Sequence, residues 1–213
     1  MVIETLRELW AKLELKVWKD YYNYNYRRFR ISAKMIEDYC SLTESSKVLE
    51  LGAWYPFIAL LSAKKFGFDP YCSDIKISKH WKNFLKIDLC SDPIPGKWDL
   101  LICSEVLEHL PVNLYKVVRK ITRSLSNSGY AFFTVPIGTK GLNIPLNKDV
   151  GEYSDDTHFQ CSYGELESFP GHLREFTPYK AQKFFESFGL PSSGKVFLTK
   201  PYIMNYGVLL IKK

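Results

Sequence analysis

The sequence predicts an open α/β sheet, and three observations support this fold class. An apolar run with one acid, residues 47–51, stops at Gly52 and is followed at once by an amphipathic segment, the pattern of a first strand turning into a first helix. Strand and helix patterns then alternate along the chain, which is typical of parallel sheets. Polar residues follow the early strands, at the edge where such sheets bind ligands. We therefore expect the functional site at the carboxyl ends of the strands.

The composition fits one globular domain with a sizeable core. The chain has 213 residues, of which 46% are hydrophobic and 24% charged, ordinary proportions for a soluble protein. Its net charge of +6 is spread along the chain, which permits an anionic partner but does not require nucleic acid. The five cysteines lack metal-finger spacing, and their odd number indicates reduced thiols. Residues 1–12 carry no apolar signal core, and no apolar run could cross a membrane, so we expect a cytoplasmic protein.

Residues 1–45 predict a small helical cap. Apolar residues recur at helical spacing over 6–17, which indicates one helix. The tyrosine-rich run 21–26 is expected to interrupt it, and a second helix is predicted over 28–39 with Ile31, Met35 and Ile36 as its apolar stripe. We interpret the basic cluster beside the tyrosines as a solvated turn, in preference to a grip for an anionic or sugar-like substrate.

From residue 47 onward, strand and helix patterns alternate at the rhythm of right-handed βαβ crossovers. The predicted strands are 47–51, a strand ending at 74, 84–88, 99–104 and 130–135; the predicted helices are 56–65 and 112–125, and a turn is predicted at 127–129.

The C-terminal part begins with a long segment, 136–172, that has several prolines and glycines and no periodicity. A loop of this length in a compact domain is usually functional, and we interpret it as a lid on the substrate side. A helix is predicted from Thr177 to Phe188. Two closing strands, 195–198 and 206–211, have the spacing of a hairpin.

Polar residues at the strand ends predict a nucleoside-binding edge. Asp74 lies 22 positions after Gly52 and closes the second strand, where a carboxylate accepts hydrogen bonds from ribose hydroxyls. The turn after the first strand is poorly suited to bind a pyrophosphate. Trp54 and Pro56 occupy positions where a dinucleotide site needs glycines, and proline has no N–H to donate. A cofactor with a sulfonium cation and an amino-acid tail makes no such demand, and Glu50 suits its ammonium group.

Two stretches resemble class I S-adenosylmethionine-dependent methyltransferases. They are Val-Leu-Glu-Leu-Gly at 48–52 and Asp-Leu-Leu-Ile-Cys-Ser-Glu-Val-Leu-Glu-His-Leu at 99–110, in which Glu-Val-Leu-Glu-His is the most specific piece. The similarity extends over about residues 45–213 and includes the run His-Leu-Arg-Glu-Phe-Thr at 172–177. It departs at the turn after the first strand, where family members usually carry two or three glycines. The resemblance implies a Rossmann-like, seven-stranded, mostly parallel sheet with helices on both faces and the last strand antiparallel.

The resemblance also implies roles for individual residues. Glu50 and Gly52 would lie at the methionine end of the cofactor, Asp74 at the ribose, and Asp88 at the adenine amino group, with Leu89 or Cys90 flanking the ring and Ser104 beneath the sulfur. The positions expected to bind S-adenosylmethionine are Glu50, Gly52, Ala53, Asp74, Ile75, Asp88, Leu89 and Ser104.

The expected chemistry is transfer of a methyl group to an oxygen or nitrogen atom of a small polar or sugar-like acceptor. Such an acceptor needs to be held in line and, in many cases, deprotonated. The candidate catalytic residues are Glu105, Glu108, His109 and His172, although His109 suits a structural role equally well. We expect no resident metal, no nucleic-acid partner and no membrane.

Two alternatives stay open at this point. The same four side chains resemble the set with which small-RNA 3′-terminal 2′-O-methyltransferases hold a divalent ion, but the chain lacks a strong basic stripe for RNA. The second alternative is a non-catalytic, methyltransferase-like scaffold in which Trp54 and Pro56 fill the methionine pocket.

Overall fold

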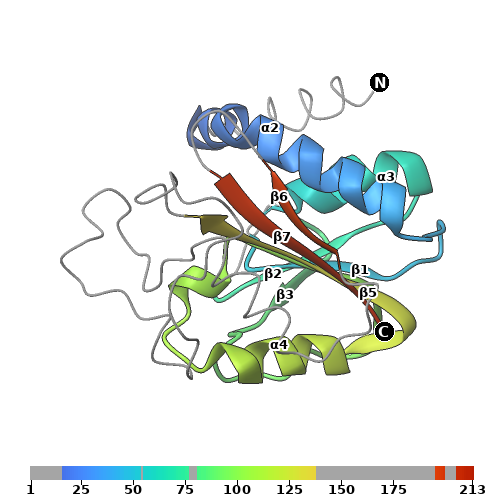
Figure 1. Cartoon of the computed structure of the whole chain (residues 1–213), viewed down its shortest axis with the longest axis vertical. Helices are drawn as coiled ribbons and strands as arrows, with labels where there is room; N and C mark the ends of the chain where they lie inside the picture. Colours follow the sequence, from blue (N-terminus) through green and yellow to red (C-terminus); the bar gives the residue numbers. More distant parts are fainter. Residues whose placement is uncertain (1–15, 54, 77–80, 138–194, 200–204) are drawn as a thin grey trace, which may run out of the picture. The chain divides into compact units, whose positions relative to one another are not determined.

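The computed structural model describes residues 16–53, 55–76, 81–137, 195–199 and 205–213 (Figure 1). The chain divides into two compact units, Met1–Lys86 and Ile87–Lys213, which we call the N-terminal unit and the C-terminal unit and describe separately.

The N-terminal unit contains one long helix, α2 (Lys16–Tyr39). The predicted break at 21–26 is wrong, because the helix runs through the tyrosine-rich stretch without interruption. Tyrosine and asparagine cost less than about 1 kcal/mol each in a helix, so packing elsewhere on the helix outweighs them. The buried stripe is formed by Phe29, Ala33 and Ile36, whereas Ile31 is exposed, which corrects the predicted stripe.

Three parallel strands accompany this helix: β1 (Val48–Leu51), β2 (Tyr71–Asp74) and β3 (Phe84–Lys86), in the pairing order β1–β2–β3. Helix α3 (Phe57–Phe66) connects β1 to β2 and ends at Gly67, which adopts the left-handed conformation. The predicted third strand is too long, since β3 ends at Lys86 and Asp88 follows it in a turn.

Helices α2 and α3 lie side by side (Figure 1). The ring of Phe29 stacks on that of Phe57 with centroids 5.2 Å apart, and Lys65 Nζ donates to the carbonyl of Glu37 at 2.6 Å. The described part of the predicted cap therefore packs as a helix pair with the first helix of the α/β region.

The C-terminal unit contains β4 (Trp98–Ser104), the 3₁₀ turn η1 (Leu107–His109), α4 (Leu114–Arg123), β5 (Leu125–Ile137), β6 (Lys195–Thr199) and β7 (Asn205–Lys212). Strand β5 pairs parallel with β4 and antiparallel with β7, which in turn pairs antiparallel with β6. Helix α4 is capped by Asn113, whose side chain accepts from the N–H of Lys116. Its apolar side contacts β5 and buries Leu114, Val117, Val118 and Ile121.

The predicted turn at 127–129 lies inside β5 as a bulge. The pairing of β4 with β5 moves from Leu125 to Tyr130 on β5 while it moves only from Trp98 to Leu100 on β4. A Cβ atom on Gly129 would lie 2.7 Å from the carbonyl oxygen of Trp98. The bulge therefore needs glycine at this position because the two backbones approach too closely for any side chain.

Several sequence predictions fall outside the described residues: the helix over 6–17 up to residue 15, most of the predicted lid, and the helix from Thr177. The predicted lid also begins too early, since β5 continues through Ile137. No helix in the described part of the chain is long and apolar enough to cross a membrane.

We expect Gly129→Ala to lower the free energy of unfolding by about 1–3 kcal/mol, because the added methyl group must push two backbones apart. Urea denaturation followed by circular dichroism measures this change. Ser128→Ala, one residue away and exposed, is the control and should stay within about 0.5 kcal/mol of wild type. Equal midpoints for both variants would contradict the close approach.

Candidate functional site

Glu50 is a buried carboxyl group that caps helix α3 from strand β1. Only 4% of the residue is exposed. Its Oε2 accepts the N–H of Ala59 at 2.9 Å, and the N–H of Ile58 also donates to this carboxyl group. The N-cap residue itself, Pro56, provides no side-chain cap. Glu50 thus satisfies amide groups that the first turn of a helix otherwise leaves without partners.

Burial raises the pKa of Glu50 from its ordinary value of 4.5 to about 8, although the two amide hydrogen bonds and the charge of Arg28 act in the opposite direction. The cost of removing a charge from water exceeds the gain from these contacts. The carboxyl group therefore keeps its proton up to neutral pH. Its predicted contact with the cofactor's ammonium group stays a prediction.

The carboxyl ends of β1 and β2 bring four predicted residues together. Gly52 has a φ of 64°, and the next residue, Ala53, donates its N–H to the carbonyl of Ser73 at 2.8 Å. Asp74 closes β2, and its Oδ1 accepts the N–H of Lys76 at 3.1 Å. Among the described residues, no donor reaches the other carboxylate oxygen of Asp74. Ile75, which follows it, is 58% exposed and leaves an apolar surface beside this carboxylate.

Tyr55 is a residue of this edge that the sequence analysis missed. It is only 6% exposed, and its hydroxyl has no hydrogen-bond partner among the described residues. Its ring packs against Phe57 and, edge to face, against Trp81. Burial raises the pKa of Tyr55 to about 12, so the hydroxyl stays a donor. A buried donor without a partner is costly, so this hydroxyl is a destabilising feature of the edge; its signal in the sequence was an aromatic residue directly after the first-strand turn.

In the C-terminal unit, a tight turn holds Asp88. Its Oδ1 accepts the N–H of Cys90 at 2.7 Å, and its own N–H donates to Asp92 Oδ2 at 2.8 Å. The Cys90 amide, together with Ser91 and the charge of Lys120, lowers the pKa of Asp88, so this side chain is an ionised acceptor. Leu89 is buried and Cys90 half-buried, which leaves Cys90 the more accessible of the two predicted ring neighbours.

The carboxyl end of β4 carries a chain of hydrogen bonds that includes Ser104 and Glu105. Thr134 Oγ1 donates to Glu105 Oε1 at 2.8 Å, and Ser104 Oγ lies 2.8 Å from the same Thr134 hydroxyl. Because the Thr134 hydroxyl has one proton and gives it to Glu105, Ser104 is the donor to Thr134. The sequence analysis missed Thr134, which lies at the end of the predicted fifth strand. Glu105 adopts a φ of 56°, a strained value for a residue with a side chain.

Glu108 and His109 form a second pair in η1. Glu108 is fully buried, while 43% of the His109 side chain is exposed, and His109 Nε2 lies 3.7 Å from Glu108 Oε1. Burial and the charge of Glu108 raise the pKa of the Cys103 thiol on β4. The structure therefore brings Glu105 together with Thr134 and Ser104, and Glu108 together with His109. His172 lies outside the described residues, and in the described part of the chain no group of three or more His, Cys, Asp or Glu residues could hold a metal ion.

Comparison with known proteins identifies the fold. No family model and no curated protein matches the sequence, but solved structures do. The plantazolicin methyltransferase BpumL, solved in complex with SAH, matches with a TM-score of 0.63 and 12% identity over 93% of this chain and 89% of that chain. The chain has the class I methyltransferase fold. The predicted α/β Rossmann-like arrangement, with parallel strands β1–β5 and helices between them, is thereby confirmed.

Other proteins of this fold differ in name and length. The [4+2]-cyclase SpnF matches with a TM-score of 0.58 and 12% identity, over 86% of this chain and 80% of that chain. A candidate O-methyltransferase from Nostoc punctiforme matches with a TM-score of 0.54 and 13% identity, over 88% of this chain. The chain spans only 56% of the Nostoc protein and 36% of a matched coclaurine N-methyltransferase. At such identities the likeness concerns the fold alone.

The raised pKa of Glu50 predicts a pH-dependent stability. Between about pH 4.5 and pH 8 the folded state holds a proton that the unfolded chain releases, so this stabilising contribution is complete at low pH and is lost as the pH rises to about 8. Glu50→Gln lacks this titration. Its free energy of unfolding should therefore improve relative to wild type as pH rises from about 5 to about 8, by at most about 1.4 kcal/mol per pH unit.

Urea denaturation at a series of pH values measures this difference between wild type and Glu50→Gln. The control is Glu44→Gln, which removes an exposed carboxylate from the loop before β1. If the difference in free energy of unfolding between wild type and Glu50→Gln does not change with pH, the pKa of Glu50 is not raised and the prediction is wrong.

Proposed function

We propose that this chain is an S-adenosylmethionine-dependent methyltransferase that acts on an oxygen or nitrogen atom of a small polar or sugar-like acceptor. The observation that carries the proposal is the edge formed by β1 and β2. There Asp74 presents an open carboxylate oxygen beside the Gly52–Ala53 turn and the exposed Ile75. The class I fold supports it, and the structure of BpumL contains SAH.

The residues at the strand ends fit the chemistry of this cofactor. A half-exposed carboxylate with one open oxygen, as in Asp74, suits ribose hydroxyls. Asp88 is held ionised by the Cys90 amide and suits an exocyclic amino group, while Ile75 and Cys90 offer apolar or polarisable surface to a flat ring. Glu50 accepts amide hydrogen bonds from α3, and we propose that it fixes the turn and contacts the cofactor's ammonium group directly or through water.

The cofactor, when bound, supplies a methyl group that its sulfonium already activates. The chain then has to hold the acceptor in line and take up its proton. We propose that His109, which is partly exposed, accepts this proton and that the buried Glu108 beside it orients and stabilises the imidazole. Glu105, held by Thr134, and His172 are the further candidates.

The finer features of the fold belong to the same proposal. We propose that the seven strands form one mostly parallel sheet with β7 as its antiparallel member, as the resemblance implies. We also propose that residues 1–45 form a cap on a catalytic domain of residues 46–213, and that residues 136–172 contribute to the acceptor side.

The alternatives receive less support. The metal-assisted reaction on RNA is not favoured, since the described residues contain no group of three or more His, Cys, Asp or Glu that could hold a metal ion; its fourth proposed ligand, His172, lies outside them. A non-catalytic scaffold is compatible with the fold, which also occurs in a protein named as a cyclase. Binding and turnover measurements distinguish these cases.

Wild-type protein should bind S-adenosylmethionine with a dissociation constant in the micromolar range, measured by isothermal titration calorimetry. Asp74→Asn should weaken binding by about 1.5–3 kcal/mol, because it removes charge-assisted hydrogen bonds to the ribose. The control is Asp69→Asn, just before the amino end of β2, where the carboxylate contacts the side chains of Lys82 and Asn83. If wild type releases no heat and shows no thermal shift, the methyltransferase proposal fails.

Methyl transfer should depend on His109 in a way that cofactor binding does not. In a screen of hydroxylated and amine-bearing metabolites with labelled S-adenosylmethionine, His109→Gln should lower kcat by about 10²–10⁴-fold, the usual contribution of a general base. Glu108→Gln should lower kcat less, and the cofactor affinity of both variants should stay at the wild-type value. EDTA should leave turnover unchanged. Loss of turnover with EDTA would instead favour the metal-assisted reaction.

A further inference from the structure

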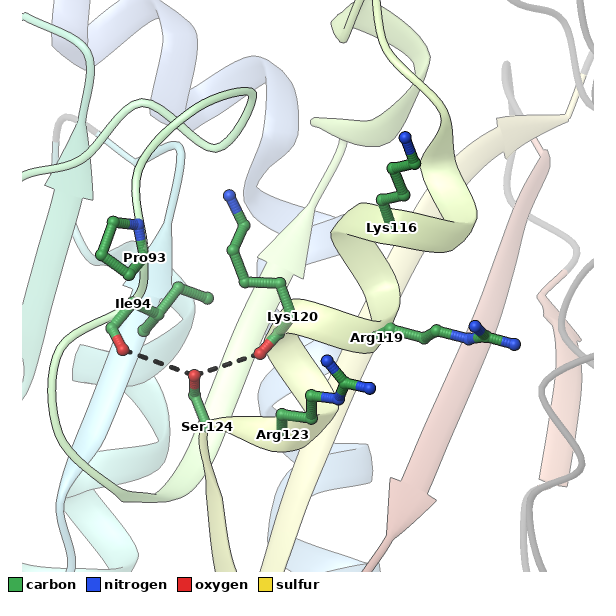
Figure 2. Close-up of a pocket in the computed structure, with 7 residues that line it drawn as sticks. All are labelled: Pro93, Ile94, Lys116, Arg119, Lys120, Arg123 and Ser124. Carbon is green, nitrogen blue, oxygen red and sulfur yellow. Dashed lines mark hydrogen bonds between the residues drawn. The ribbon is translucent and has the colours of Figure 1, made fainter.

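Helix α4 borders a groove that no residue of the proposed active site lines. The groove has a volume of about 440 Å³ and is lined by two apolar residues of the loop before β4 and by five polar or charged residues at the helix (Figure 2). These are Pro93, Ile94, Lys116, Arg119, Lys120, Arg123 and Ser124. We call it the α4 groove.

The α4 groove lies at the opposite edge of the C-terminal unit from Ser104. The carbonyl of Ser124 accepts the N–H of Trp98, the first residue of β4, at 3.0 Å, and Ser124 Oγ donates to the carbonyl of Ile94 at 3.4 Å. Ser104 is the last residue of the same strand, about 20 Å away at the usual rise per residue. A ligand at the Ser124 end of the groove is therefore distinct from an acceptor at Ser104, whereas Lys120, which donates to the carbonyl of Leu89, borders the turn that holds Asp88.

The groove gathers basic side chains of α4, of which Lys120 also stabilises the charge of the Asp88 carboxylate. Lys116, Lys120 and Arg123 follow one another at helical spacing along α4 (Figure 2), which places them on one side of the helix. In the part of the chain that the structure describes, no carboxylate pairs with Lys116, Arg119 or Arg123. Asp92 contributes one negative charge beside this loop, and its carboxylate oxygens accept from the Asp88 amide and the Ser91 hydroxyl.

Lys120 is fixed in place at the centre of the groove. Its ammonium group donates to the carbonyls of Leu89 and Asp92, each at 2.6 Å. An ammonium has three N–H donors, so one donor is left for a ligand. Because the Lys120 side chain is already ordered, ligand binding loses less conformational entropy than it would at a mobile lysine, which favours the binding free energy.

The volume and the lining residues of the groove indicate which class of anionic ligand it can bind. Its volume suits a small molecule, and arginine and lysine together are the side chains that recognise phosphate groups. Pro93 and Ile94 form an apolar wall against which an uncharged part of the ligand can pack. Among the described residues no aromatic side chain lines the groove, so these residues offer no platform on which the bases of single-stranded nucleic acid could stack.

We propose that the α4 groove binds a small molecule that carries a diphosphate or two closely spaced phosphate groups. The ligand's phosphates contact Lys116, Lys120 and Arg123, and its uncharged part lies against Pro93 and Ile94. The proposal does not require methyl transfer, although Lys120 also holds the turn that contains Asp88 and Leu89.

The experiment uses inorganic pyrophosphate and ADP as probes, at about physiological salt so that weak surface attraction is screened. Binding is followed by calorimetry and by amide chemical shifts in ¹⁵N-labelled protein. Wild type should bind both probes, with shifts centred on Ile94, Lys120 and Ser124, and ADP should bind more tightly than pyrophosphate. Lys116→Gln/Arg123→Gln should weaken binding at least about tenfold, the effect of losing charge-assisted contacts.

The matched control is Lys64→Gln/Lys86→Gln, which removes the same charge from exposed positions of the N-terminal unit and should bind as wild type does. Circular dichroism checks that both double variants are folded. Three results would overturn the proposal: no binding of either probe, equal weakening in the control variant, or shifts centred away from the groove. Much tighter binding of a short RNA duplex that displaces pyrophosphate would overturn it in favour of a nucleic-acid surface.

Discussion

The N-terminal unit depends on one contact, the buried carboxyl group of Glu50 at the first turn of α3. This contact fixes the direction in which the chain leaves β1, because the side chain comes from the strand and its partners belong to the helix. It also explains why Pro56 is tolerated at the N-cap, where serine, threonine or aspartate normally supplies the acceptor. Because the amides of this helix end already have a hydrogen-bond acceptor, they are not free to bind phosphate. This agrees with the prediction from the sequence that the turn after the first strand does not bind a pyrophosphate.

The elements near residues 47–125 could be predicted because their signals are local. Apolar runs, Gly52 and the periodicity of α4 each act within a few residues, and their bounds differ from the prediction by one or two positions. Other features depend on long-range contacts that a sequence does not display. The stretch at 21–26 is helical because α2 packs along α3, and 127–129 joins β5 because the backbone of Trp98 lies against Gly129.

The candidate site also contains some residues that local sequence signals predict and others that depend on long-range contacts. Asp74 and Gly52 were predictable, since their position after a strand defines the edge on which they lie. Thr134 and Tyr55 were not, because one acts through a neighbouring strand and the other through burial of its hydroxyl. The environment of Glu108 could not be predicted either, since the Glu-Val-Leu-Glu-His stretch does not reveal that its second carboxylate is buried while the adjacent imidazole is exposed.

The backbone of Glu105 places stability and chemistry in conflict. Its positive φ favours glycine by about 1 kcal/mol, and a chain optimised only for folding would place glycine there. Glycine would also delete the carboxylate that Thr134 holds at the end of β4. Laboratory selection for thermostability alone is therefore expected to accumulate glycine at this position and to discard the carboxylate, whereas selection for activity has to preserve a residue that the backbone disfavours.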